Sequence, residues 1–135
     1  MHKILFLLLL FVAAPLRAEV HNIDDRQLAE LIARGVPLVD IRRPDEWRQT
    51  GVIKGSHLLT FFDAKGRYDI NAWLRRFRRI AGKDDPVILI CRTGRRSALV
   101  GHFLDEKVGY RKVYNVTRGI TDWIRKGHPV VAPQR

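Results

Sequence analysis

Residues 86–97 read Pro86-Val87-Ile88-Leu89-Ile90-Cys91-Arg92-Thr93-Gly94-Arg95-Arg96-Ser97 and contain the only cysteine of the chain. The apolar run at 86–90 predicts a buried β-strand that ends at the cysteine. A helical pattern that carries Ala98, Leu99, Phe103 and Leu104 begins within a few residues of the end of this strand. We therefore expect a strand, a short loop and a helix in succession, which is the repeating unit of an α/β fold.

The same alternation extends outward from this unit in both directions. Asp24 is a suitable N-cap for a helix that Gly35 ends. The other predicted elements are strands at 37–41 and 112–116 and helices at 44–49, 71–80 and 119–126. Together they predict a single α/β domain over residues 19–135, with a central parallel sheet and helices on both faces.

Length and composition restrict the class of protein. The chain has 135 residues and a mass of 15.6 kDa, which suffices for one domain and not for two ordinary cores. Hydrophobic residues make up 46% of it, which excludes a disordered or collagenous protein. The formal net charge of +11 favours anionic substrates or surfaces over cationic ones.

The N-terminus has the three-part pattern of a secretory signal. Ile4 to Ala14 is an unbroken apolar run between Lys3 and a boundary that ends at Ala18. As a helix this run would reach only about 17 Å, short of the roughly 30 Å of hydrocarbon in a bilayer. We therefore predict a signal peptide at 1–18 with cleavage after Ala18, a periplasmic or secreted protein, and no stable membrane span. The alternative is a retained helix that lies on a membrane or is buried.

The loop after the predicted strand has the features of an anion-binding site around a nucleophile. Unpaired N–H groups of the loop and of the first helical turn are expected to converge on the sulfur of Cys91. Arg92, Arg95 and Arg96 follow within five residues and favour the thiolate, which is the nucleophilic form. The alternative is that the cysteine is a small buried residue that merely completes the strand.

Three segments of the sequence resemble the rhodanese family of sulfurtransferases, including its exported single-domain members. Val39-Asp40-Ile41-Arg42 with Glu46 and Gly51 to Gly55 is similar to the first family signature, and residues 91–97 resemble the active-site loop. Gly119 to Trp123 resembles the closing segment. These matches follow one another in the family's order and span almost all of residues 19–135.

The resemblance implies a sulfur-transfer site in this loop. Cys91 would take the outer sulfur from a small anionic donor such as thiosulfate and carry it as a persulfide to a thiol or to cyanide. The loop residues Arg92, Thr93, Gly94, Arg95, Arg96 and Ser97 would bind the donor and the persulfide, with Arg96 closing the loop. The chemistry implies no metal and no organic cofactor. In the supporting positions, we expect Asp40 to hydrogen-bond across the strand ends and Arg42 to pair with Asp45 or Glu46.

Three other functions are alternatives. A phosphatase or arsenate reductase on the same fold also surrounds an anion with a cysteine-to-arginine loop, but Cys91 to Arg96 is C-x4-R, one residue shorter than the phosphate-handling C-x5-R loops. A non-catalytic module would bind an acidic partner through the basic helix at 71–80. No stacking aromatics are interleaved on its polar face, since Trp73 and Phe77 are better explained as core residues, and export conflicts with a nucleic-acid role. This helix is therefore either accessory or a docking face for an acidic protein. A metal site is not expected, because the histidines lack ligand spacing and only one thiol is present.

Overall fold

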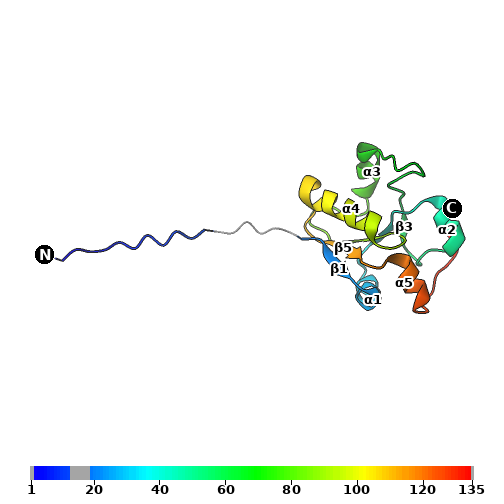
Figure 1. The fold of residues 1–135 in the computed structure, drawn as a ribbon, viewed down its shortest axis with the longest axis horizontal. Helices are drawn as coiled ribbons and strands as arrows, with labels where there is room; N and C mark the ends of the chain where they lie inside the picture. The colour runs from blue at the N-terminus through cyan, green and yellow to red at the C-terminus, as the bar shows by residue number, and fades with distance from the viewer. Residues whose placement is uncertain (1, 13–18, 135) are drawn as a thin grey trace.

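In the part of the chain that the structure describes, five parallel strands form the centre of the domain (Figure 1), and their spatial order is β1-β5-β4-β2-β3. This computed structural model describes residues 2–12 and 19–134. Leu38 pairs with Ile88 and Val87 pairs with Val113, so the central strands are in parallel register. The strands are β1 (His21–Ile23), β2 (Leu38–Asp40), β3 (His57–Leu58), β4 (Val87–Ile90) and β5 (Val113–Val116).

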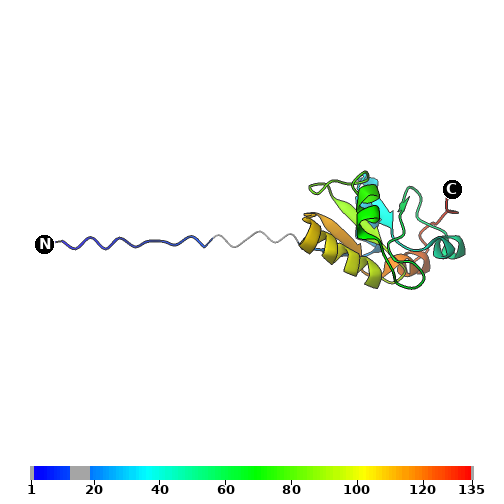
Figure 2. The same cartoon turned by 90° about the horizontal axis from the view of Figure 1, so that it is seen from above.

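Helices cover both faces of this sheet, as the sequence predicts. On one face lie α1 (Asp25–Ala33) and α5 (Gly119–Arg125), and on the other lie α3 (Ile70–Phe77) and α4 (Arg95–Phe103) (Figures 1 and 2). A short α2 (Pro44–Thr50) follows β2, and a π-helical turn, η1 (Leu104–Val108), extends α4. Asp24 caps α1 through a hydrogen bond from the backbone N–H of Gln27.

The two faces of β4 supply two different apolar layers. Ile88 and Ile90 pack in the layer below α1 and α5, whereas Val87, Leu89 and Cys91 belong to the layer below α3 and α4. This alternation follows from the two-residue period of an extended chain. It places the cysteine on the same face of the sheet as α4.

The structure corrects two predictions about the helices. Leu99, which the sequence pattern places among the apolar residues of its helix, is 65% exposed. The buried residues of α4 are Ser97, Val100 and Gly101, so small side chains face the sheet and the helix approaches it closely. The predicted helix at 71–80 ends at Phe77, although its apolar face and its exposed arginines lie as expected.

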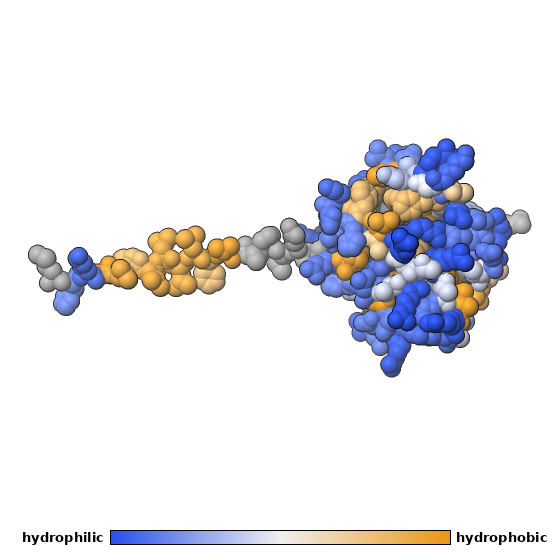
Figure 3. Space-filling view, in the orientation of Figure 1, coloured by the Kyte–Doolittle hydropathy of each residue, from blue (hydrophilic) through white to orange (hydrophobic). Residues whose placement is uncertain are grey.

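Residues 2–12, which hold most of the N-terminal apolar run, lie outside the domain (Figure 1). Residues 2–12 carry no helix or strand, and the side chains from Ile4 to Val12 are exposed (Figure 3). The predicted cleavage point after Ala18 falls outside the described residues. Within residues 2–12 and 19–134, no helix has both the length and the apolar character needed to cross a bilayer.

Candidate active site

Cys91 lies at the carboxyl end of β4, and two backbone N–H groups and a hydroxyl group lie close to its sulfur. The backbone N–H of Gly94 donates to Sγ over 3.2 Å and that of Ser97 over 3.4 Å. The hydroxyl oxygen of Ser97 lies 3.2 Å from the same sulfur. The expected convergence of loop N–H groups on Cys91 is therefore present in the structure.

Two glycines allow this loop to close against the segment that follows β5. Gly94 has a φ of +96° and Gly119 a φ of +62°, a region of the backbone map that L side chains rarely adopt. A side chain on Gly94 would collide with the Thr117 carbonyl, and one on Gly119 would collide with the Arg92 carbonyl. The N–H of Ile120 donates to the Cys91 carbonyl over 3.0 Å, so α5 is attached directly to the loop.

The loop residues divide into buried and exposed groups. Gly94 and Ser97 are buried beside the sulfur, whereas Arg92, Thr93 and Arg95 are exposed. The two exposed arginines are open to solvent. Their side chains make no ion pair within the described part of the chain.

The side chain of Arg96 reaches outside the loop to α2. Its guanidinium makes a two-pronged pair with the carboxylate of Glu46 in α2, with Nη1–Oε1 and Nη2–Oε2 distances of 2.7 Å. Glu46 also accepts from the backbone N–H of Arg43 over 3.3 Å. Arg96 therefore joins the first turn of α4 to α2.

The Glu46–Arg96 pair is stabilised as an ion pair. Hydrogen bonding to Glu46 raises the pKa of Arg96. Burial raises the pKa of Glu46, but the hydrogen bonds from Arg96 and from the Arg43 backbone outweigh this burial, so that the pKa lies below its usual value. Both groups are thus charged at neutral pH.

Asp40 and Arg42 form a second, fully buried pair, which corrects the expectation that Arg42 pairs with Asp45 or Glu46. Arg42 Nε donates to Asp40 Oδ1 over 3.0 Å and Nη2 donates to Oδ2 over 2.8 Å. Trp47 Nε1 donates to the same carboxylate over 3.1 Å, and Arg42 Nη1 donates to Thr50 Oγ1 over 2.8 Å. These contacts attach α2 to the end of β2, so both residues support the site without touching the sulfur.

A polar chain behind the cysteine was not anticipated from the sequence. Ser97 Oγ donates to Asn115 Oδ1 over 2.5 Å, and Asn115 Nδ2 donates to Asn22 Oδ1 over 3.1 Å. The strand register explains the contact, because β5 lies between β1 and β4 and Asn115 pairs with Asn22 and Leu89. An isolated asparagine in a β-branched run gave no signal of this role.

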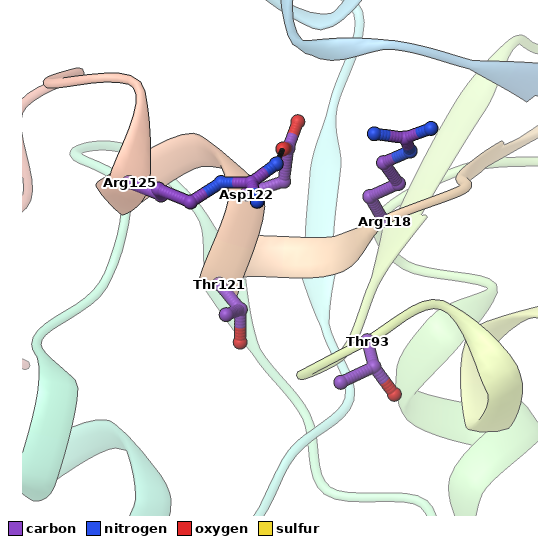
Figure 4. A pocket seen from close by; sticks show the side chains of 5 residues that line it. All are labelled: Thr93, Arg118, Thr121, Asp122 and Arg125. Atoms are coloured by element: carbon purple, nitrogen blue, oxygen red, sulfur yellow. Dashed lines mark hydrogen bonds and ion pairs between the residues drawn. The ribbon is translucent and has the colours of Figure 1, made fainter.

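A shallow pocket of about 300 Å³ opens beside the loop. Thr93 forms its loop side, and the remaining lining residues are Arg118, Thr121, Asp122 and Arg125 (Figure 4). Arg125 Nη2 is paired with Asp122 Oδ1 at 2.6 Å. The Arg118 and Thr93 side chains point in opposite directions (Figure 4), so the lining groups do not converge on one ligand atom.

This arrangement defines an α/β domain with a loop that directs backbone N–H groups at a buried cysteine, and comparisons with known proteins give its family. A family model described as the rhodanese-like domain matches residues 24–126. The chain is 34% identical over 122 residues to a sulfurtransferase of Allochromatium vinosum, covering 85% of this chain and 98% of that protein. It is 31% identical over 112 residues to a thiosulfate sulfurtransferase of Tolumonas auensis, covering 82% and 93% of the two chains.

A solved structure agrees with these relatives. A rhodanese-related protein from Thermoplasma volcanium matches with a TM-score of 0.63 and 30% identity, over 84% of this chain and 99% of that one. The chain belongs to the rhodanese-like domain family. Its similarity to relatives named as sulfurtransferases supports sulfurtransferase activity at the level of the family.

Proposed function

We propose that this protein is a sulfurtransferase that moves a sulfane sulfur from thiosulfate or a similar anionic donor to a thiophilic acceptor through a persulfide on Cys91. The observation that carries the proposal is the pair of backbone N–H groups, those of Gly94 and Ser97, that donate to Sγ within 3.4 Å. These groups stabilise negative charge on sulfur without a metal or an organic cofactor.

The reaction has two balanced steps. The thiolate of Cys91 attacks the outer sulfur of thiosulfate, the S–S bond of the donor breaks, and sulfite leaves with the electron pair. The acceptor, such as cyanide, then attacks the outer sulfur of the persulfide and leaves as thiocyanate, which restores the thiolate. This is covalent catalysis of the ping-pong type.

The charges around the loop fit an anionic donor. Arg96 is neutralised by Glu46, so the exposed Arg92 and Arg95 are the loop cations that can attract and orient the donor. The chain as a whole carries a formal charge of +11, which adds to the attraction of anions from solvent.

The same pairing disfavours the phosphatase or arsenate reductase alternative. An oxyanion site needs the arginine that ends the loop to face the bound anion with its guanidinium. In this structure both terminal nitrogens of that arginine, Arg96, bind Glu46 at 2.7 Å. The short C-x4-R loop and this pairing both favour a single sulfur as the bound group.

The basic helix α3 and the N-terminus give two further parts of the proposal. Arg75, Arg76, Arg78 and Arg79 are exposed on or directly after α3, which supports docking of an acidic protein as an accessory role. The apolar N-terminal run supports export to the periplasm or the exterior, with cleavage after Ala18.

The test is the formation of thiocyanate from thiosulfate and cyanide. We expect steady turnover by the wild type and none by Cys91→Ser, whose hydroxyl stays protonated and is a poor nucleophile toward sulfur. An aryl phosphate offered to the same preparation should remain intact. Efficient phosphate release without thiocyanate would contradict the proposal and favour the phosphatase alternative.

A further inference from the structure

The Ser97 hydroxyl has one proton and three neighbours that compete for it. Its oxygen lies 2.5 Å from Asn115 Oδ1, 3.3 Å from the Gly94 carbonyl and 3.2 Å from Cys91 Sγ. The amide of Asn115 is oriented by its other contacts, because Nδ2 donates to Asn22 Oδ1 over 3.1 Å and to the Gly94 carbonyl over 3.4 Å. Oδ1, which can only accept, therefore faces the serine.

The shortest of these contacts decides where the proton lies. With the hydroxyl proton directed to Asn115, the oxygen of Ser97 presents a lone pair to the sulfur, and the thiol of Cys91 can donate to it. When the thiol ionises, that hydrogen bond is lost and the lone pair faces a negative charge. The hydroxyl can stabilise the thiolate only by turning away from Asn115.

We infer that Asn115 is a positioning residue that holds the Ser97 proton away from Cys91 and so favours the thiol over the thiolate. The backbone N–H groups of Gly94 and Ser97 act in the opposite direction, and the balance sets the reactivity of the resting cysteine. The consequence of this orientation for sulfur transfer rests on the proposed function, whereas the effect of the orientation on the thiol does not.

The charged groups of the elements around the loop are separate from this polar chain. β5 contributes the uncharged Asn115, and each charged group belongs to another element. A shift in Asn115→Ala, which changes no charge, therefore reports the orientation of the hydroxyl. The charged groups are Arg92, Arg95 and Arg96 of the loop and α4, Asp40 and Arg42 at the end of β2, Glu46 of α2, and Arg118 after β5.

The test measures the rate of Cys91 alkylation by iodoacetamide as a function of pH on the purified chain, in which it is the only thiol. Asn115→Ala frees the hydroxyl to donate to the thiolate, so the midpoint of the profile should fall by about one pH unit, the effect of one hydrogen bond to a charged group. Asn115→Asp keeps the acceptor and adds a negative charge, so its midpoint should rise. Asn71→Ala, which changes an exposed asparagine of α3 away from the polar chain, is the matched control and should leave the midpoint in place.

A double-variant comparison separates orientation of the serine from general damage. In a Ser97→Ala background, Asn115→Ala should shift the midpoint no further, because no hydroxyl remains to orient. An unchanged or raised midpoint in Asn115→Ala, or a shift that persists without the serine, overturns the inference. If the alanine variant fails to fold, Ser97→Ala alone decides, because loss of a hydroxyl that accepts from the thiol lowers the midpoint, whereas a raised midpoint would show a hydroxyl that donates to the thiolate and would overturn the inference. Wild-type protein that alkylates as expected but forms no thiocyanate would contradict the proposed function alone.

Discussion

The guanidinium of Arg96 and the carboxylate of Glu46 meet in parallel, with both N–O distances at 2.7 Å, across 50 residues of sequence. This contact fixes the first turn of α4, which supplies Ser97 and its N–H to the sulfur. The arginine therefore affects the loop through α2, and its planar fork is what permits two hydrogen bonds at once.

Replacing either partner should reduce sulfur transfer more than stability. Arg96→Lys offers one point charge in place of a fork, and we expect thiocyanate turnover to fall roughly tenfold, the loss of one charged hydrogen bond. Glu46→Gln should have a similar effect, and the double variant should lose less than the two single losses combined. Arg67→Lys, at an exposed pair with Asp63, is the control. Wild-type turnover in Arg96→Lys would contradict this assignment.

Glycine 94 should be irreplaceable for a steric reason. In Gly94→Ala the new methyl group meets the Thr117 carbonyl at a φ of +96°, so the loop must open and thiocyanate formation should be lost. Gly66→Ala is the matched control, because that site has a φ of +77° and no atom within 4 Å of the new group. It should cost about 1–2 kcal/mol of unfolding free energy and retain turnover. Equal activities of the two variants in a thiocyanate assay would refute the steric argument.

The stability of the domain should depend on pH through Asp25. Hydrogen bonds from Lys126 and then from His128 lower the pKa of Asp25 from 3.8 to about 2. Because the folded-state pKa lies below the unfolded one, the stabilisation is present above about pH 4 and is lost as the pH falls toward 2.

Denaturant unfolding between pH 2 and pH 5 checks this dependence. Asp25→Asn should lower the free energy of unfolding at pH 7 and flatten its decline in that window. Asp84→Asn removes an exposed carboxylate and should retain the wild-type slope. A wild-type slope in Asp25→Asn would show that other carboxylates cause the decline.

Export should be visible at the N-terminus of the isolated protein. We predict a first residue of Glu19 in the extracytoplasmic fraction, and Ala18→Arg should leave a precursor, because cleavage requires a small residue at the boundary. N-terminal sequencing distinguishes these results. A chain that begins with Met1 and stays in the cytoplasm would contradict the prediction.

The sheet and the cysteine loop could be predicted from the sequence because both are encoded locally. The run from Val87 to Ile90 identifies its strand, and the glycine and arginines after Cys91 identify the loop. The face of α4 was predicted less well, since the residues that meet the sheet include Ser97 and Gly101, whereas the sequence pattern emphasises large apolar side chains such as Leu99.

The residues that pair with Arg42 and Arg96 could be identified only from the structure. Arg42 was expected to pair with its neighbours in the next helix, but residues two apart in an extended chain point to the same side, which brings it to Asp40. The Glu46 carboxylate pairs with Arg96 instead. Contacts of this kind, like that between Ser97 and Asn115, join segments far apart in sequence, and no local pattern specifies them.

The most direct test of the central claim is the intact mass of the chain after incubation with thiosulfate and then with cyanide. We predict that the wild type gains the mass of one sulfur atom, that cyanide removes it as thiocyanate, and that Cys91→Ser gains nothing. A serine variant that gains and transfers sulfur, or a wild type that turns over thiosulfate without ever carrying the added mass, would contradict a persulfide on Cys91.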